Sequence, residues 1–156
     1  MTMPATIEPR VHGLLSDPAA VRVLATSDRT GRPHAVVAED PIALGADGRL
    51  RYLERLEGSP SQRNLVASLW FDRPVALTLR RGDLSFEVVG RAVKSVVAGP
   101  EFREAYAAVR SRSPAADLAA VWHIEPLEVT ELTYEHRRLR QETERPFLTH
   151  LDRLAR

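Results

Sequence analysis

Tight-turn signals recur between short apolar segments, and they are the feature that most limits the folds open to this chain. Asp28-Arg-Thr-Gly31, Asp47-Gly48 and Arg81-Gly82-Asp83 each separate two runs rich in branched residues. Connections this short join antiparallel strands, because parallel neighbours need a crossover of a dozen or more residues. The pattern therefore predicts a sheet built mainly from hairpins.

The apolar runs beside these turns supply the expected strands. They span residues 21–27, 33–39, 50–54, 74–80, 84–97 and 120–132. Gly90 stands where the alternation slips, which predicts a bulge, and Pro126 predicts an edge position or a bulge in the last strand. Curved strands with bulges favour closure over a flat sheet. We therefore expect a mainly β fold, a six-stranded antiparallel barrel with flanking helices.

Helical periodicity appears in three places before the tail, at residues 8–16, 59–72 and 100–112. In the second helix, Trp70 and Phe71 are expected on the buried side with the neighbouring apolar residues. Trp122 shares a strand face with Ile124, so its ring fits a core, an interface or a stacking position.

From residue 135 the chain is mixed in charge and is predicted to be helical. It closes on an apolar stripe that could dock on the body or on another subunit, made of Phe147, Leu148, Leu151 and Leu154.

The second helix has an unusually complete start. Ser59 is suited to cap it, Pro60 occupies the first helical position, and Gln62 completes a Ser-x-x-Gln capping box. Free N–H groups at such an end attract anions, and Arg63 adds a positive charge. The hydroxyls of Ser59 and Ser61 are close enough to share a phosphate. A capping box also serves a helix that binds nothing, so both alternatives stay open.

Composition excludes several classes of function. The chain has no cysteine, which rules out disulfides, thiolate nucleophiles and Cys-bearing metal sites. Lys and Arg total 22 against 21 acidic residues, which gives no footprint for nucleic-acid binding. The five histidines show no metal-ligand spacing, so no metal site is expected. There is no run of apolar residues long enough for a membrane span and no signal-peptide pattern, so we expect a cytoplasmic protein.

Taken in order, several segments resemble the FMN-binding split-barrel family related to pyridoxamine 5′-phosphate oxidase. The resemblance covers roughly residues 10–133. The segments that carry it are Val23-Leu-Ala-Thr-Ser-Asp-Arg-Thr-Gly-Arg-Pro-His34, Asp47-Gly-Arg-Leu-Arg-Tyr52, Ser59 to Leu65, Arg73-Pro-Val-Ala-Leu-Thr-Leu79, Val88-Val-Gly-Arg-Ala92 and Trp122-His-Ile-Glu-Pro126.

This resemblance implies a homodimer of split barrels with FMN at the subunit interface. It places the phosphate at the helix start that follows the strand of Tyr52, the region that the capping pattern also indicates. His34 would lie beside the ring and ribityl chain, and Trp122 would come from the partner subunit. The residues expected at the phosphate are Ser59, Ser61, Gln62, Arg63 and Asn64, and Tyr52 is also expected to bind the cofactor.

The tail departs from the family's vitamin B6 oxidases, so pyridoxamine 5′-phosphate oxidation is not expected. We expect two parts: an FMN-binding domain at 1–133 and a helical tail at 134–156. The leading hypothesis is an FMN-dependent oxidoreductase acting on a small organic molecule or a nicotinamide cofactor. The alternatives are a non-catalytic flavin-binding module, a deazaflavin site, or a haem protein with His123, His136 or His150 as axial ligand.

Overall fold

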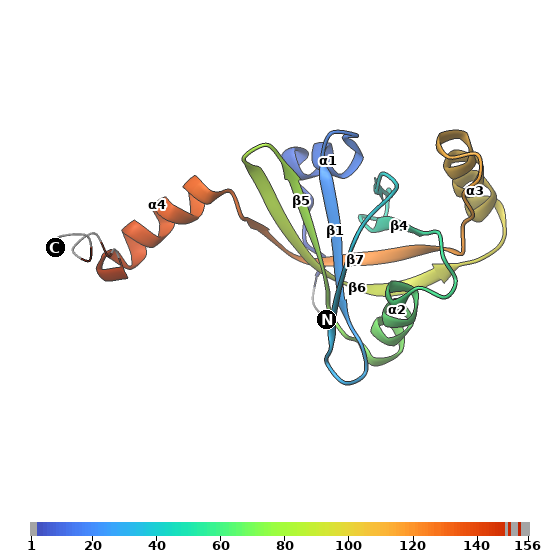
Figure 1. Cartoon of the computed structure of the whole chain (residues 1–156), viewed down its shortest axis with the longest axis horizontal. Helices are drawn as coiled ribbons and strands as arrows, with labels where there is room; N and C mark the ends of the chain where they lie inside the picture. The colour runs from blue at the N-terminus through green and yellow to red at the C-terminus, as the bar shows by residue number, and fades with distance from the viewer. Residues whose placement is uncertain (1–2, 149, 151–152, 154–156) are drawn as a thin grey trace.

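The computed structural model describes residues 3–148, 150 and 153 of this chain (Figure 1). The strands in chain order are β1 (Val21–Ser27), β2 (Pro33–Val37), β3 (Ala43–Leu44), β4 (Leu50–Glu54), β5 (Val75–Arg81), β6 (Leu84–Val96) and β7 (Ala120–Glu131). The helices are α1 (Pro9–Ser16), α2 (Pro60–Phe71), α3 (Pro100–Arg112), α4 (Tyr134–Glu144) and the short 3₁₀ helix η1 (Pro146–Leu148).

All these strands belong to one antiparallel sheet in the order β2-β1-β5-β6-β7-β4-β3. The three predicted turns join β1 to β2, β3 to β4 and β5 to β6. The mainly β, antiparallel fold with flanking helices is therefore confirmed. The predicted strand number of six is wrong by one, because Ala43 and Leu44 pair with β4 as a short seventh strand.

Two irregularities bend the long β6 and β7 strands, which run across the upright β1 and β5 (Figure 1). The register shifts between Val89 and Gly90, where a side chain on Gly90 would meet the Glu125 carbonyl oxygen at 2.6 Å. β7 lies inside the sheet, yet Pro126 falls beyond the last residue that pairs with β4, so its missing N–H breaks no bond there. The bulge predicted at Gly90 is confirmed, and Pro126 pairs with Gly90 at the same irregularity; the second register shift lies between Ala92 and Lys94.

The main core is formed by buried apolar side chains of the sheet, of α1 and of α2. α1 contributes Val11, Leu14 and Leu15, all of them buried. A second, smaller core of Val109, Leu118 and Val121 lies under α3. No helix in the described part of the chain is long and apolar enough to cross a membrane.

The tail helix α4 leaves the end of β7 and points away from the sheet (Figure 1). It buries none of its residues. Of the stripe expected to dock, Phe147 is 93% exposed and Leu148 is 45% exposed, while Leu151 and Leu154 lie outside the described residues. In the single chain, the described stripe residues are therefore not packed on the barrel.

Candidate functional site

A cleft opens between α2 and the turn that joins β1 to β2. Its volume is about 740 Å³, within the roughly 300–1,000 Å³ typical of ligand pockets. Its lining residues are Asp28, Arg29, Thr30, Glu57, Gln62, Arg63, Asn64, Val66, Ala67, Trp70 and Phe71. A smaller pocket of about 280 Å³ shares Asp28, Arg63 and Asn64 with it and adds Arg32, Pro33, His34 and Pro60.

The turn side of the cleft is held in shape by Asp28. Its carboxylate accepts bonds from the Thr30 hydroxyl at 2.7 Å and from the backbone N–H groups of Thr30 and Arg32 at 2.8 and 2.9 Å. These bonds, the Thr30 hydroxyl first, lower the pKa of Asp28. Arg73 donates to the carbonyls of Asp28 and Arg29 at 2.5 and 3.2 Å. The turn is thereby tied to the chain just beyond α2.

On the helix side of the cleft, several polar side chains are buried while large apolar side chains are exposed to solvent. α2 buries polar side chains against the sheet, each at most 7% exposed: Ser61, Gln62, Asn64 and Ser68. Its outer face carries Val66 at 39%, Trp70 at 75% and Phe71 at 60% exposure. The prediction that Trp70 and Phe71 belong to the core is therefore wrong.

The buried polar residues of α2 each have a partner, which explains why this face can point inward. The Trp122 indole N–H donates to Gln62 Oε1 at 2.8 Å, and Asn64 Nδ2 donates to Thr26 Oγ1 at 3.0 Å. A buried polar group that is hydrogen-bonded avoids the desolvation penalty of an unpaired one. The outward face of α2 is thus left to the apolar side chains.

The helix begins as the capping pattern predicts, but only in part. Ser59 Oγ accepts a bond from the Gln62 backbone N–H at 3.0 Å, which confirms the cap. The reciprocal half of the box is wrong, because the Gln62 side chain turns inward to Trp122. The Ser59 N–H donates instead to the Leu56 carbonyl at 3.2 Å.

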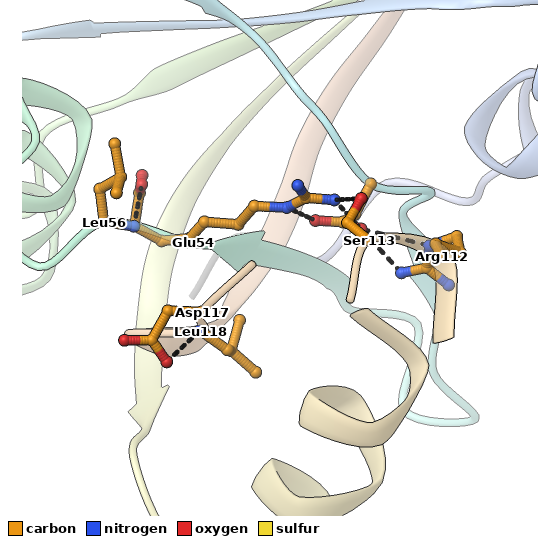
Figure 2. Close-up of polar contacts among 8 residues, drawn as sticks. Glu54, Leu56, Arg112, Ser113, Asp117 and Leu118 are labelled. Carbon is orange, nitrogen blue, oxygen red and sulfur yellow. Dashed lines mark hydrogen bonds and ion pairs between the residues drawn. The ribbon is translucent and has the colours of Figure 1, made fainter. Parts of the chain in front are cut away.

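A carboxylate of the chain already lies at the start of α2. Glu54 is 6% exposed and accepts a bond from the Ser61 hydroxyl at 2.6 Å. It also accepts a bond from the Leu56 N–H at 3.1 Å (Figure 2). Ser59 and Ser61 hydroxyls do lie close together, at 3.0 Å. Burial, and then the charge of Glu54, raises the pKa of Tyr52, which lies in the core. Ser61 and Tyr52 therefore lie behind the cleft and not on its surface.

Arg63 is the exposed cation of the helix start. Among the residues that the structure describes, its side chain makes one hydrogen bond, with Nη1 donating to the Gly58 carbonyl at 3.2 Å. It lines both pockets, together with Asn64. Across the cleft, Arg29 and Arg32 add positive charge, and His34 lines the smaller pocket. The sequence pattern did not single out these two arginines, although Arg29 lies within the predicted Asp28–Gly31 turn and Arg32 directly follows it.

Trp122 occupies a different place from the one expected at an interface. It is 1% exposed and belongs to the main core, on β7 opposite Tyr52. In the single chain it presents no aromatic surface to a partner or a ligand. The expectation that Trp122 stacks on the ligand from the partner subunit is therefore corrected. Its buried indole N–H instead donates a hydrogen bond to the Gln62 side chain on α2.

The histidines named as possible haem ligands do not line the cleft. His123 is buried, and its Nε2 lies 2.7 Å from Glu101, which also pairs with Arg51. His136 Nδ1 lies 2.8 Å from Glu131, and His150 lies exposed in the tail. Within the described residues, no group of three or more His, Asp or Glu is placed to hold a metal ion.

No protein-family model matches the chain, and no curated protein matches its sequence. Solved structures do share its fold. HupZ of Group A Streptococcus superposes with a TM-score of 0.66 at 19% identity, over 83% of this chain and 96% of that one. An FMN-binding protein of Syntrophomonas wolfei gives 0.63 at 10% identity, over 78% and 82%. An F420 reductase gives 0.60 at 20% identity, over 80% and 98%.

A heme storage protein, HutZ of Vibrio cholerae, has the same fold at a TM-score of 0.54 and 15% identity, over 81% of this chain and 95% of that one. The chain therefore has the split-barrel fold found in FMN-binding proteins. That fold is shared by proteins with different cofactors, so it does not by itself assign one.

Proposed function

We propose that this chain is a flavoprotein that binds FMN in the cleft between α2 and the β1–β2 turn and works as an oxidoreductase on a small organic molecule or a nicotinamide cofactor. The observation that carries the proposal is the composition of the cleft. One wall is apolar and aromatic, while the helix start and the turn contribute arginines. A flavin nucleotide has the matching form, a planar aromatic ring joined to an anionic phosphate.

The residues of the cleft fit this ligand. Arg63 offers a guanidinium fork to a phosphate, with Arg32 and His34 in the adjoining pocket. Asn64 has its Nδ2 engaged by Thr26, so its carbonyl oxygen is the group left to accept a bond from the ligand. Ser59 keeps the helix start in place through its cap. Together these groups bind and orient, and the bound flavin supplies the hydride and electron chemistry.

The test is the visible spectrum and the ligand binding of the purified protein. Flavin absorption bands, or a 1:1 FMN complex formed by titration of the apo-protein, support the proposal. Turnover with NAD(P)H and an electron acceptor then separates an oxidoreductase from a non-catalytic flavin module. A matched titration with the deazaflavin F420 establishes which ring system is preferred. A Soret band with no affinity for FMN would overturn the proposal in favour of haem.

The homodimer forms part of the same proposal. Support comes from the exposed apolar face of α2 and from the tail helix that points away from its own barrel. A two-fold dimer is the commonest closed assembly for a chain with uncovered surface of this kind. In such a dimer, the partner would cover the side of the cleft that is open in the single chain.

A further inference from the structure

Trp70 is the most exposed aromatic side chain of α2, and its position is unusual for a side chain of this size. Its ring is 75% exposed, although removing an indole from water is among the largest gains that folding can make. Val66 and Phe71 extend the same outward face, and all three line the cleft. An aromatic side chain left on the wall of a ligand-sized cleft indicates a surface meant to be covered.

The neighbouring ring of Phe71 is already engaged. The Arg73 guanidinium lies 5.9 Å from its centroid, and Arg73 is itself bonded to the carbonyls of the β1–β2 turn. Asp72, the residue that caps the C-terminal end of α2, pairs with Arg91 at 2.8 Å. The end of the helix is thus fixed, and the indole of Trp70 is left as the open aromatic plane of the wall.

The distance between Arg63 and Trp70 along α2 suits a ligand with a phosphate at one end and a ring at the other. Trp70 follows Arg63 by seven residues, which is about two turns, or ~10 Å at ~1.5 Å per residue. Both side chains line the same cleft, with the cation near the helix start and the ring near its end. A planar ring on a five-carbon chain with a terminal phosphate can span that separation.

We propose that Trp70 is the stacking residue for the isoalloxazine ring, with the ligand laid along α2 so that its phosphate reaches Arg63. This inference rests on the proposed flavin binding and adds the orientation of the ligand and a ring-binding residue. The electron-rich indole face suits contact with an electron-poor flavin ring. Because the contact involves only the ring, it is independent of the phosphate.

The chain has only two tryptophans, and the second, Trp122, is buried, so the contact can be followed by fluorescence. Flavin emission is quenched by an indole in van der Waals contact. Bound FMN should therefore be dark in the native protein and should regain emission in Trp70→Phe, since phenylalanine is a poor electron donor. Iodide should quench Trp70 emission in the apo-protein and lose access when FMN binds.

Affinity supplies an independent readout. Trp70→Ala should weaken FMN and riboflavin by the same factor, about 2- to 12-fold for the loss of one aromatic contact. The matched control is Tyr106→Phe, which replaces a partly exposed, quenching phenol ring on α3, outside the lining of the cleft, with a phenyl ring. It should leave both the affinity and the flavin emission unchanged.

The outcomes separate this inference from the proposed function. If FMN binds but remains equally dark and equally tight in the Trp70 variants, the stacking role is overturned while the flavin site stands. In a second outcome, iodide quenches Trp70 less as the protein concentration rises, and adding FMN does not change this quenching. A second copy of the chain then covers the ring, and the stacking role is again overturned. If the native protein binds neither FMN nor riboflavin, the proposed function fails first.

Discussion

The indole N–H of Trp122 donates to the side-chain oxygen of Gln62 at 2.8 Å, and this hydrogen bond links α2 to β7 in the core. Both side chains are buried, at 1% and 7% exposure. The pair explains why α2 shows its apolar residues to solvent: a buried indole N–H needs an acceptor, and the helix supplies one from its inner face.

Replacing Gln62 with leucine should therefore destabilise the fold by about 1–3 kcal/mol, because the indole N–H would remain buried without a partner. Urea unfolding followed by circular dichroism measures the change. Gln141→Leu on the exposed α4 is the matched control and should stay within about 0.5 kcal/mol. An equal loss in both variants would show that the bond contributes nothing specific.

A second group of polar contacts is centred on Asp40, which is 2% exposed and links the segment after β2 to the segment after β4 and to the end of α3. Arg55 donates to it at 2.7 and 2.9 Å, and Arg112 at 2.8 Å. Figure 2 shows Arg112 and Ser113 together at the end of α3. Burial raises the pKa of Asp40, but the two guanidinium groups outweigh it and hold the pKa below its ordinary value of 3.8.

Asp40→Asn should lower the free energy of unfolding at pH 7 by about 1.5–3 kcal/mol, less than for a fully buried ion pair, because the Arg55 and Arg112 side chains are 21% and 39% exposed. Because the folded pKa lies below the unfolded one, the carboxylate's contribution is complete above pH 3.8 and is lost as pH falls through the folded pKa. The deficit of the variant should thus shrink in acid.

Urea unfolding at a series of pH values from 7 to 3 measures this deficit. Asp83→Asn, in the exposed β5–β6 turn, is the control and should show no comparable deficit at pH 7. A deficit in Asp40→Asn that is constant across the series would mean that its ionisation is not what stabilises the fold.

The hairpins could be predicted because their signals are local. Asp47-Gly48 and Arg81-Gly82-Asp83 impose their turns whatever packs around them, and the flanking alternation sets which face is buried. Ser59 is predictable for the same reason, since its cap needs only the next three residues.

The orientation of α2 could not be predicted in this way. Its sequence carries apolar residues on two sides, so periodicity alone does not tell which side meets the sheet. The deciding contact, from Gln62 to Trp122, joins residues 60 positions apart. The cleft depends on this contact, which is why Trp70 was predicted as core and the position of Trp122 stayed open between core, interface and stacking.

Arg63→Ala should weaken FMN by about 10- to 100-fold and leave riboflavin nearly unchanged. Only FMN carries the phosphate, and a charge-assisted hydrogen bond contributes about 1.5–3 kcal/mol. Isothermal titration with both ligands measures the two losses. Arg103→Ala, an arginine on α3 away from the cleft, is the control. Equal losses for both ligands would mean that Arg63 acts through the fold of the helix start.

Assembly is the property on which the cleft most depends, because its apolar wall is open in the single chain. Trp70 and Phe71 remain exposed on α2, and Phe147, at 93% exposure, follows the tail helix α4, which points away from the barrel. The formal net charge of +1 sets up little repulsion between two copies. We therefore expect a two-fold dimer in which the partner closes the cleft over the flavin.

Binding and dimerisation should then be coupled. A ligand that contacts both chains stabilises the dimer by mass action, about 2.7 kcal/mol for each site when its concentration is a hundred times its Kd, so FMN should lower the dissociation constant of the dimer at least ~100-fold. Light scattering across a dilution series, with and without FMN, measures the shift. Arg63→Ala at the same FMN concentration should show a smaller shift, because less of it is loaded. A monomer that holds FMN as tightly as the concentrated protein does would rule out a cleft shared between subunits.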